Sequence, residues 1–293
     1  MHAGELDDVL SLVATEVRRY LDGLDERPLL TAGTEAAARS LGGPLPEEGE
    51  GALAALRELL DEGIEASVAS SGPRIFHFVT GGVTPAALGA DWLTSALDQN
   101  GFAWVESPLS AELERVSIAW LEDLFGLPES WGGVLTTGAT MANFVALAAA
   151  RRWWGERHRT DVDVGGLTGL PPVPVFSSGY VHATAYTALG MLVLGRGAVR
   201  VLASDDAGRL DLAALERELE KLGGAPAIVI ANAGEVNAGD FDPIDAVADL
   251  AERYGAWLHV DGAFGLFARV SPRTAELAAA VERADSVIAD GHK

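Results

Sequence analysis

The segment Ser286-Val287-Ile288-Ala289-Asp290-Gly291-His292-Lys293 joins a short apolar run to a lysine at the end of the chain. The apolar run is typical of a buried strand. A lysine directly after a strand lies where α/β proteins place their functional groups. The only other lysine, Lys221, follows Glu218 by three residues on the charged face of an expected helix, where it indicates a solvated side chain. Lys293 is therefore the first candidate for chemistry.

Predicted strands alternate with predicted helices from Gly132 to the end of the chain. Strands are expected at 134–135, 173–176, 199–202, 227–231, 257–260 and 286–289. Helices are expected at 141–153, 184–194, 212–222 and 244–254. This alternation predicts βαβ units, and hence an α/β fold with a mostly parallel sheet flanked by helices.

The first part of the chain has helical rather than alternating patterns. Apolar residues at helical spacing predict helices at 5–22, 52–69, 85–98 and 110–125, the last with Ser110 as its N-cap. The segment 74–82 is aromatic and ends in glycines, which indicates a loop or a short strand. We expect an N-terminal helical arm over residues 1–83 and a large domain over residues 84–293.

Composition excludes several classes of protein. The net charge of −22 disfavours nucleic-acid binding, because an acidic surface repels phosphate backbones. The absence of cysteine excludes disulfides, thiolate metal sites and a cysteine nucleophile, and it fits a cytoplasmic location. The polar, acidic N-terminus does not resemble a signal peptide, and no apolar stretch reaches the ~20 residues of a membrane helix. These features predict a soluble protein that does not bind membranes.

Two loops after predicted strands carry candidate functional groups. The turn 136–140 joins a strand to a helix, and its small residues allow either a phosphate cradle or an ordinary tight turn. It is neither a Walker A loop nor a dinucleotide fingerprint. Asp261 ends the strand 257–260, where it is either a functional carboxylate or a loop cap.

Histidines at the same predicted edge leave two alternatives open. His182 follows the strand 173–176 and is either structural or catalytic. His259 and Asp261 lie two apart in a strand and so share one face, where they could bind a metal together with His292. Such a set would suit a metal-dependent hydrolase, although catalytic metal sites usually show a tighter ligand cluster.

The candidates together match the needs of pyridoxal 5′-phosphate. A phosphate cradle, a histidine, an aspartate and a lysine occur in that order, each just after a predicted strand. This cofactor requires a lysine for its Schiff base, a carboxylate that keeps the ring nitrogen protonated, and backbone donors for its phosphate.

The chain also resembles the group II pyridoxal-phosphate-dependent amino-acid decarboxylases, a family that includes the aromatic-amino-acid and glutamate decarboxylases. The resemblance runs from about Arg74 to Lys293. Its markers are the segments 106–114, 137–143, 234–244, 259–264 and 290–293.

The resemblance implies a fold type I transferase-like architecture and a carboxy-lyase that converts an L-amino acid to an amine and carbon dioxide. It implies a homodimer with its active site at the interface. In the family a small C-terminal domain follows the lysine. That domain is absent from this chain, so the large domain is expected to be incomplete and to end at the Schiff-base lysine.

The resemblance also assigns roles to individual residues. Lys293 would hold the cofactor as a Schiff base, Asp261 would pair with the pyridine nitrogen, and His182 would stack on the ring. The remaining expected cofactor-binding residues are Gly138, Ala139, Thr140, Asn232, Ala263, Ser286 and His292. His77, Phe78 and Thr80 fall in the segment that lines the substrate site, and no metal is expected.

Three departures from the family pattern leave the substrate open. Met141 stands where a glutamate is usual, Gly291 where a proline or small residue is common, and Phe264 where a tyrosine is common. The orientation of the bound substrate decides which bond breaks. An aminotransferase or an aldehyde-forming enzyme is therefore an alternative on the same scaffold.

Overall fold

A computed structural model describes residues 3–293, which divide into two compact units. The first extends to Ala96 and includes His292, and the second comprises Leu97–Gly291 together with Lys293. No helix among the described residues is both long enough and apolar enough to cross a membrane.

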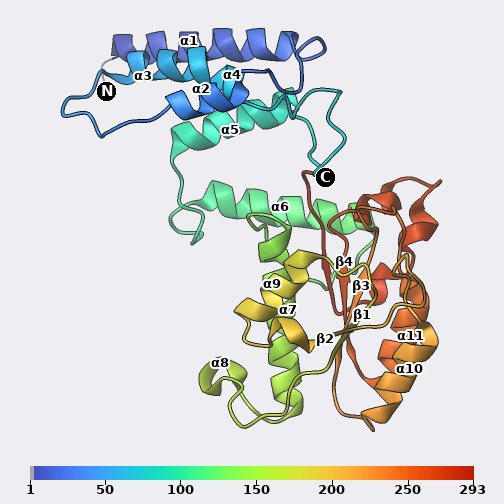
Figure 1. Ribbon diagram of the computed structural model, residues 1–293. Coiled ribbons are helices and arrows are strands. Elements are labelled where there is room, and N and C mark those ends of the chain that lie inside the picture. Colours follow the sequence, from blue (N-terminus) through green and yellow to red (C-terminus); the bar gives the residue numbers. More distant parts are fainter. Residues whose placement is uncertain (1–2) are drawn as a thin grey trace. The chain divides into compact units, whose positions relative to one another are not determined.

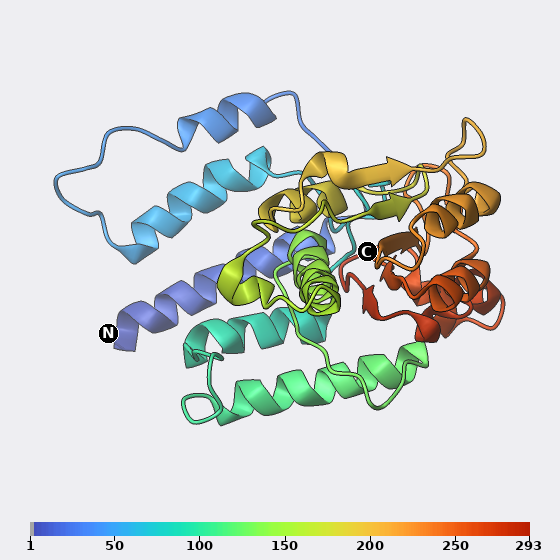
Figure 2. The ribbon, with the colours of Figure 1, turned by 90° about the horizontal axis from the view of Figure 1, so that it is seen from below.

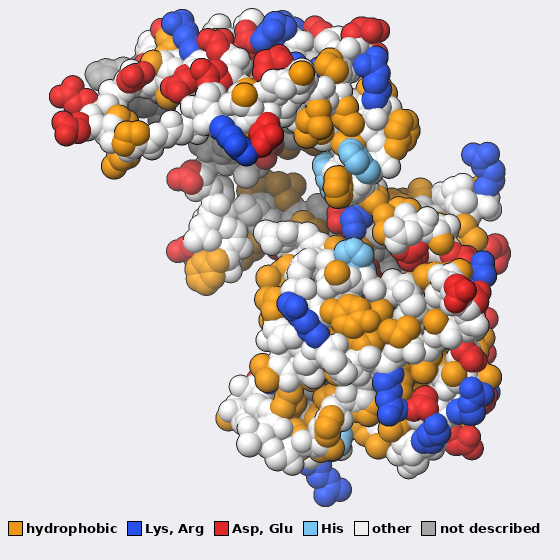
Figure 3. Space-filling model, viewed as in Figure 1, with side chains coloured by type: hydrophobic (Ala, Val, Ile, Leu, Met, Phe, Trp, Pro, Cys, Tyr) orange, Lys and Arg blue, Asp and Glu red, His pale blue; other side chains and the backbone are white. Residues whose placement is uncertain are grey.

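The first unit is helical (Figure 1). Its helices are α1 (Ala3–Asp22), α2 (Thr34–Ser40), α3 (Ala52–Glu58), the π-turn η1 (Leu59–Gly63), α4 (Ile64–Ala66) and α5 (Pro85–Leu97). The single helix expected over 52–69 is thus interrupted by a π-turn and ends three residues early. Arg27 holds that end in place, since its guanidinium donates to the Ile64 carbonyl at 2.5 Å. Acidic and basic side chains are interspersed over the visible face of this unit (Figure 3).

The second unit contains a five-stranded parallel sheet, which confirms the predicted parallel sheet with five of its six expected strands. Its strands are β1 (Val175–Ser177), β2 (Val199–Val201), β3 (Ile228–Asn232), β4 (Trp257–Asp261) and β5 (Ser286–Ile288). Their spatial order is β2-β1-β3-β4-β5, and every neighbouring pair is parallel. The connections that leave β1 and β3 run in opposite directions. In such sheets this reversal opens a crevice at the carboxyl ends of the two strands.

Helices cover both faces of this sheet (Figure 2). Helices α7 (Ala139–Arg157) and α9 (Ala183–Met191) pack on one face, and α10 (Leu212–Lys221) and α11 (Ile244–Tyr254) pack on the other. The unit is completed by α6 (Pro108–Phe125), α8 (Val162–Gly165), η2 (Arg196–Ala198), η3 (Leu266–Val270), η4 (Ala275–Ala278) and η5 (Val281–Arg283).

The two cores explain why the central strands are continuous apolar runs. Ile228 and Ile230 of β3 join the core beneath α7 and α9, whereas Val229 of the same strand joins the core beneath α10 and α11. Alternate residues of one strand therefore face different cores, and both sets must be apolar.

The expected strand at 134–135 does not form. Val134 and Leu135 are exposed, and neither pairs with a strand of the described sheet. The Leu135 N–H donates instead to Glu114 Oε1 at 3.0 Å, so a side chain of α6 takes the place of a strand partner.

The predicted N-cap of the helix at 110–125 is also wrong. Helix α6 begins at Pro108, with Ser107 as its N-cap. Proline suits the first helical position because its fixed φ fits the helix and its missing N–H is not needed there. Ser110 lies inside the helix, where its Oγ accepts from Ser107 Oγ at 2.8 Å.

Candidate active site

The candidate residues of the second unit gather at the carboxyl edge of the sheet. Asn232 and Asp261 end β3 and β4 as paired neighbours, and Asp261 in turn pairs with Ile288 of β5. Lys293 follows Ile288 by five residues. Asn232 and Asp261 are therefore neighbours at this edge, and Lys293 lies a short distance along the chain from the strand beside them.

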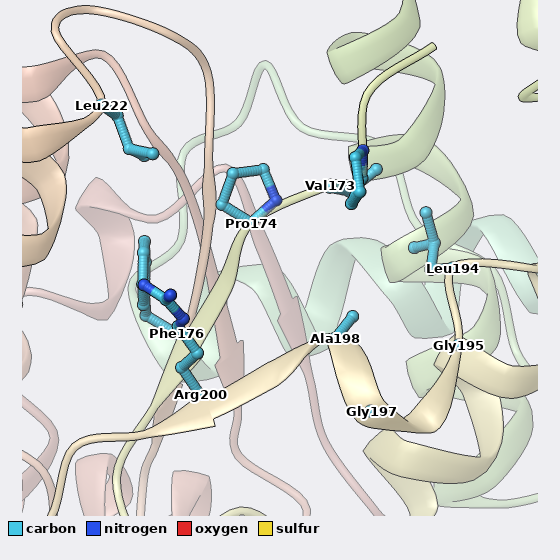
Figure 4. A pocket seen from close by; sticks show the side chains of 10 residues that line it. Val173, Pro174, Phe176, Leu194, Gly195, Gly197, Ala198, Arg200 and Leu222 are labelled. Atoms are coloured by element: carbon cyan, nitrogen blue, oxygen red, sulfur yellow. The ribbon is translucent and has the colours of Figure 1, made fainter. Parts of the chain in front are cut away.

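A pocket of about 530 Å³ lies at the opposite edge of the sheet (Figure 4). It is lined by Val173 and Pro174 before β1, Ala198 before β2 and Leu222 before β3, among others. Since these residues precede their strands, this pocket is separate from the candidate site.

The turn before α7 has the features of a phosphate cradle. Gly138 is the N-cap residue at φ 115°, a conformation that side chains rarely adopt. A Cβ built at Gly138 would have no neighbour within 4 Å, so the space beside it is open. No side chain caps this 19-residue helix. The N–H groups of its first turn, at Ala139 and Thr140, are therefore suited to an anion.

The Asp261 carboxylate is buried, with a relative exposure of 6%. Its Oδ1 accepts from the Ala263 N–H at 3.1 Å, and its Oδ2 accepts from Asn143 Nδ2 at 3.0 Å. Both donors are neutral. The carboxylate is thus held in one orientation while its charge remains available to a positive partner.

His259 is fully buried beneath this carboxylate. Its Nε2 is 2.8 Å from Asn143 Oδ1, and its Nδ1 is 3.0 Å from Ser286 Oγ. Burial lowers the pKa of His259 to about 4, although the Asp261 carboxylate and Ser286 oppose that shift. The ring is therefore neutral at pH 7.

These contacts argue against the metal alternative. Both ring nitrogens of His259 are already hydrogen-bonded within the protein. Within residues 3–293 no group of three or more histidine, aspartate or glutamate side chains could hold a metal ion.

His182 is exposed and caps α9 with its own ring. Its Nδ1 accepts from the Thr184 N–H at 3.2 Å and lies 2.9 Å from Thr184 Oγ1. Thr184 Oγ1 also accepts from Asn143 Nδ2 at 3.1 Å. The structure therefore links His182 to Asp261 through two residues that sequence reasoning missed. The available signal for Asn143 was an amide in the mostly apolar first half of a helix, five residues after Gly138.

Asn232 belongs to a second buried cluster at the β1–β3 crevice. Its Nδ2 donates to Ser178 Oγ at 3.2 Å and to Asp242 Oδ2 at 2.9 Å, and its N–H donates to the same Oδ2 at 2.8 Å. Burial raises the pKa of Asp242, and the hydrogen bonds from Asn232 and Ser178 oppose that rise. Sequence reasoning also missed Ser178 and Asp242, although both accept hydrogen bonds from the predicted residue Asn232 and so hold its side chain in place.

The predicted residues Lys293, Ser286 and His292 lie on or after β5 and differ in their surroundings. Lys293 Nζ lies 3.6 Å from Asp290 Oδ2 as an ion pair. Ser286 Oγ contacts His259 and accepts from Trp257 Nε1 at 3.0 Å, so the buried network already engages this hydroxyl. His292 is exposed.

The predicted substrate residues, His77, Phe78 and Thr80, lie in the first unit and are exposed. Phe78 has a φ of 58°, which is strained for an aromatic residue. Their role toward a substrate stays a prediction.

The second unit thus provides an open turn at an uncapped helix start, a buried carboxylate with neutral donors, and a lysine shortly after a strand. These are the three groups that pyridoxal phosphate requires, so the residues present fit that cofactor.

Comparison with known proteins identifies relatives along nearly the whole chain. Residues 45–293 match the pyridoxal-dependent decarboxylase conserved domain. Cysteine sulfinic acid decarboxylase of Rattus norvegicus is 31% identical over 291 residues, covering 98% of this chain and 58% of the relative. L-2,4-diaminobutyrate decarboxylase of Rhizobium meliloti (strain 1021) is 33% identical over 256 residues, covering 85% of this chain and 49% of the relative.

The fold is also found among solved structures. The crystal structure of mouse CSAD in apo form matches with a TM-score of 0.84 at 30% identity, covering 98% of this chain and 60% of that chain. The chain therefore spans about half the length of the curated relatives that it matches.

Proposed function

Because this chain belongs to the pyridoxal-dependent decarboxylase family, we propose that the protein containing it decarboxylates an L-amino acid to an amine and carbon dioxide with pyridoxal phosphate as cofactor. The observation that carries this proposal is the buried Asp261 carboxylate, held only by neutral donors at the edge where Lys293 follows β5.

Each residue of this edge has a distinct proposed task. Pyridoxal phosphate supplies, when bound, a conjugated ring that accepts the electron pair left by the departing carboxylate. Asp261 holds a proton at the ring nitrogen, since an anion there favours the protonated form. Lys293 anchors the cofactor covalently, and His182 covers the ring.

The phosphate and the flanks of the ring have their own proposed partners. The backbone of Gly138, Ala139 and Thr140 binds the phosphate, as helix N-termini commonly do. The residues proposed to complete the cofactor site are Asn232, Ala263, Ser286 and His292.

The direct test is product analysis with the full-length protein. The panel contains L-aspartate, L-glutamate, L-cysteine sulfinate, L-2,4-diaminobutyrate and the aromatic amino acids. The names of the relatives cover both an acidic and a basic substrate, so both kinds belong in the panel. We expect carbon dioxide and the matching amine from at least one member. A keto acid without carbon dioxide would mean transamination, and an aldehyde would mean aldehyde-forming chemistry; either would overturn decarboxylation.

Substrate selection is proposed to involve His77, Phe78 and Thr80. Alanine variants of these residues should change KM among panel members more than they change cofactor affinity. Equal KM values in the variants and the parent protein would exclude that role.

We also propose that the protein is a homodimer, with its active site at the subunit interface. The supporting observation is an apolar stripe on α6, formed by Leu109, Leu113, Trp120 and Leu124, each at least 45% exposed. At 100° per residue these side chains fall within about 60° of one another, and such exposed stripes mark contact surfaces.

Light scattering tests the dimer. Trp120→Glu should lower the molar mass of the protein in solution. Val164→Glu is the control, since Val164 is also exposed but lies outside the stripe. A dimer that persists in Trp120→Glu, or a monomeric parent protein, would contradict the proposal. A cytoplasmic location remains a prediction from the absence of cysteine.

A further inference from the structure

Asn143 stands at the centre of a buried hydrogen-bond chain. It is fully buried in α7, and its amide contacts three side chains, two from β4 and one from α9. Oδ1 lies 2.8 Å from His259 Nε2, and Nδ2 lies 3.0 Å from Asp261 Oδ2 and 3.1 Å from Thr184 Oγ1. Its whole hydrogen-bonding capacity is therefore directed at the candidate site.

The donors and acceptors of this chain run in one direction. The indole Nε1 of Trp257 can only donate, and it donates to Ser286 Oγ at 3.0 Å. At the other end, the Asp261 carboxylate can only accept, so Asn143 Nδ2 donates to it and Oδ1 faces His259 Nε2. A neutral His259 consequently donates from Nε2 to Asn143 Oδ1 and accepts the Ser286 hydroxyl proton at Nδ1, 3.0 Å away.

This direction fixes the orientation of the Asn143 amide. Because the Asp261 carboxylate can only accept, Nδ2 must face Asp261 and Thr184, and Oδ1 must face His259. Asp261 thereby gains a donor that carries no charge. No arginine or lysine among residues 3–293 forms an ion pair with Asp261, so no cationic side chain of these residues neutralises the carboxylate.

The same amide acts on His182. Since Thr184 Oγ1 accepts from Asn143, its own proton is directed to His182 Nδ1 at 2.9 Å. The Thr184 N–H also donates to that nitrogen. His182 is therefore held with its proton on Nε2.

We propose that Asn143 is a positioning residue, which orients the Asp261 carboxylate for the ring nitrogen of the cofactor and, through Thr184, sets the tautomer of His182. The proposal rests on the proposed use of pyridoxal phosphate and adds to it a residue that never touches the cofactor. Its consequence is that cofactor affinity depends on which atoms stand at position 143, and not only on whether the core is filled.

The test measures cofactor affinity in the full-length protein. Apoprotein is titrated with pyridoxal phosphate, and the dissociation constant is read from the visible absorbance between pH 6 and pH 8.5. The variants are Asn143→Asp, which keeps the shape, and Asn143→Leu, which keeps the volume without polar atoms. Leu147→Ala is the matched control, because Leu147 is fully buried one turn further along the same helix and contacts an apolar core.

Asn143→Asp should give a distinctive pH dependence. Two carboxylates at hydrogen-bond distance share one proton, which leaves as the pH rises. Relative to the parent protein, affinity should be nearly unchanged at pH 6 and about tenfold weaker or more at pH 8.5, as the donor to Asp261 is replaced by a like charge. Asn143→Leu should be weaker by a similar factor at every pH.

Leu147→Ala should lower the melting temperature and leave the dissociation constant within about twofold, because a cavity removes packing but no hydrogen bond. The proposal is overturned if Asn143→Asp follows the parent protein at every pH, or if Leu147→Ala weakens binding as much as Asn143→Leu. Should Asn143→Leu not fold, Asn143→Asp alone decides. A parent protein that binds the cofactor but releases no carbon dioxide would refute the decarboxylase function and leave this comparison intact.

Discussion

Replacing His259 with glutamine should make the protein less sensitive to acid. His259 is fully buried and neutral, with both ring nitrogens hydrogen-bonded. In the unfolded chain the same ring takes up a proton near pH 6.5, whereas in the folded chain burial lowers its pKa to about 4. Its contribution to stability is therefore fully present above pH 6.5 and is lost as the pH falls toward 4.

The size of this loss follows from the two pKa values. The difference between 6.5 and about 4 is equivalent to about 3 kcal/mol, at 1.36 kcal/mol for each tenfold change. About 2 kcal/mol of this is lost by pH 5, which corresponds to a fall in melting temperature on the order of 5 °C. Glutamine has no titrating group, so the variant lacks this loss.

The assay compares melting temperatures of the parent and His259→Gln apoproteins by circular dichroism between pH 7.5 and pH 5. The loss of good hydrogen bonds should make the variant less stable at pH 7.5, by an amount that does not depend on pH. The difference in melting temperature between the two proteins should then become smaller as the pH falls, since every other titrating group is common to both. Melting curves that shift in parallel over this range would refute the assignment of a buried neutral imidazole.

Three further substitutions test the role of Asp261, the packing at Gly155 and the hydrogen bond of Tyr180. Asp261→Asn keeps the shape of the side chain but removes its charge and one of its two acceptor oxygens. Turnover per folded protein should fall on the order of 100-fold, and stability should fall by about 1–3 kcal/mol because a buried amide N–H would face the Ala263 N–H or Asn143 Nδ2; an activity within twofold of the parent would exclude the proposed role. Gly155→Ala should destabilise the protein by about 1–3 kcal/mol, because the new Cβ would lie 2.4 Å from a valine methyl, whereas Gly165→Ala, with no neighbour within 4 Å, should be nearly neutral in the same thermal melt. Tyr180→Phe removes the 2.9 Å hydrogen bond to Asp240 and should lower the free energy of unfolding by about 1 kcal/mol. Burial and this carboxylate raise the pKa of Tyr180 to about 12, so the parent should lose stability relative to the variant as the pH rises above 10.

The sheet could be predicted because its strands are short apolar runs between clear helical patterns. β3 is buried on both faces, and its sequence is continuous in apolar residues up to Asn232. The expected strand at 134–135 has only two apolar residues, and its backbone is engaged by Glu114, a residue from another element. Local pattern does not specify such a partner.

Local sequence pattern likewise predicts some residues of the candidate site and not others. Asp261 and Lys293 could be predicted because Asp261 ends one apolar strand and Lys293 comes soon after another. Asn143 could not, since its partners Asp261 and His259 lie 118 and 116 residues away in the sequence. The role of a buried amide can be recognised only when the folded structure shows its hydrogen-bond partners.

Covalent mapping determines whether Lys293 is the residue that holds the cofactor. The full-length protein is incubated with pyridoxal phosphate, reduced with borohydride, digested, and analysed by mass spectrometry. We predict the cofactor adduct on Lys293, its loss together with the visible absorbance in Lys293→Ala, and an unchanged result in Lys221→Ala. An adduct on a different lysine, or visible absorbance that survives in Lys293→Ala, would contradict the account.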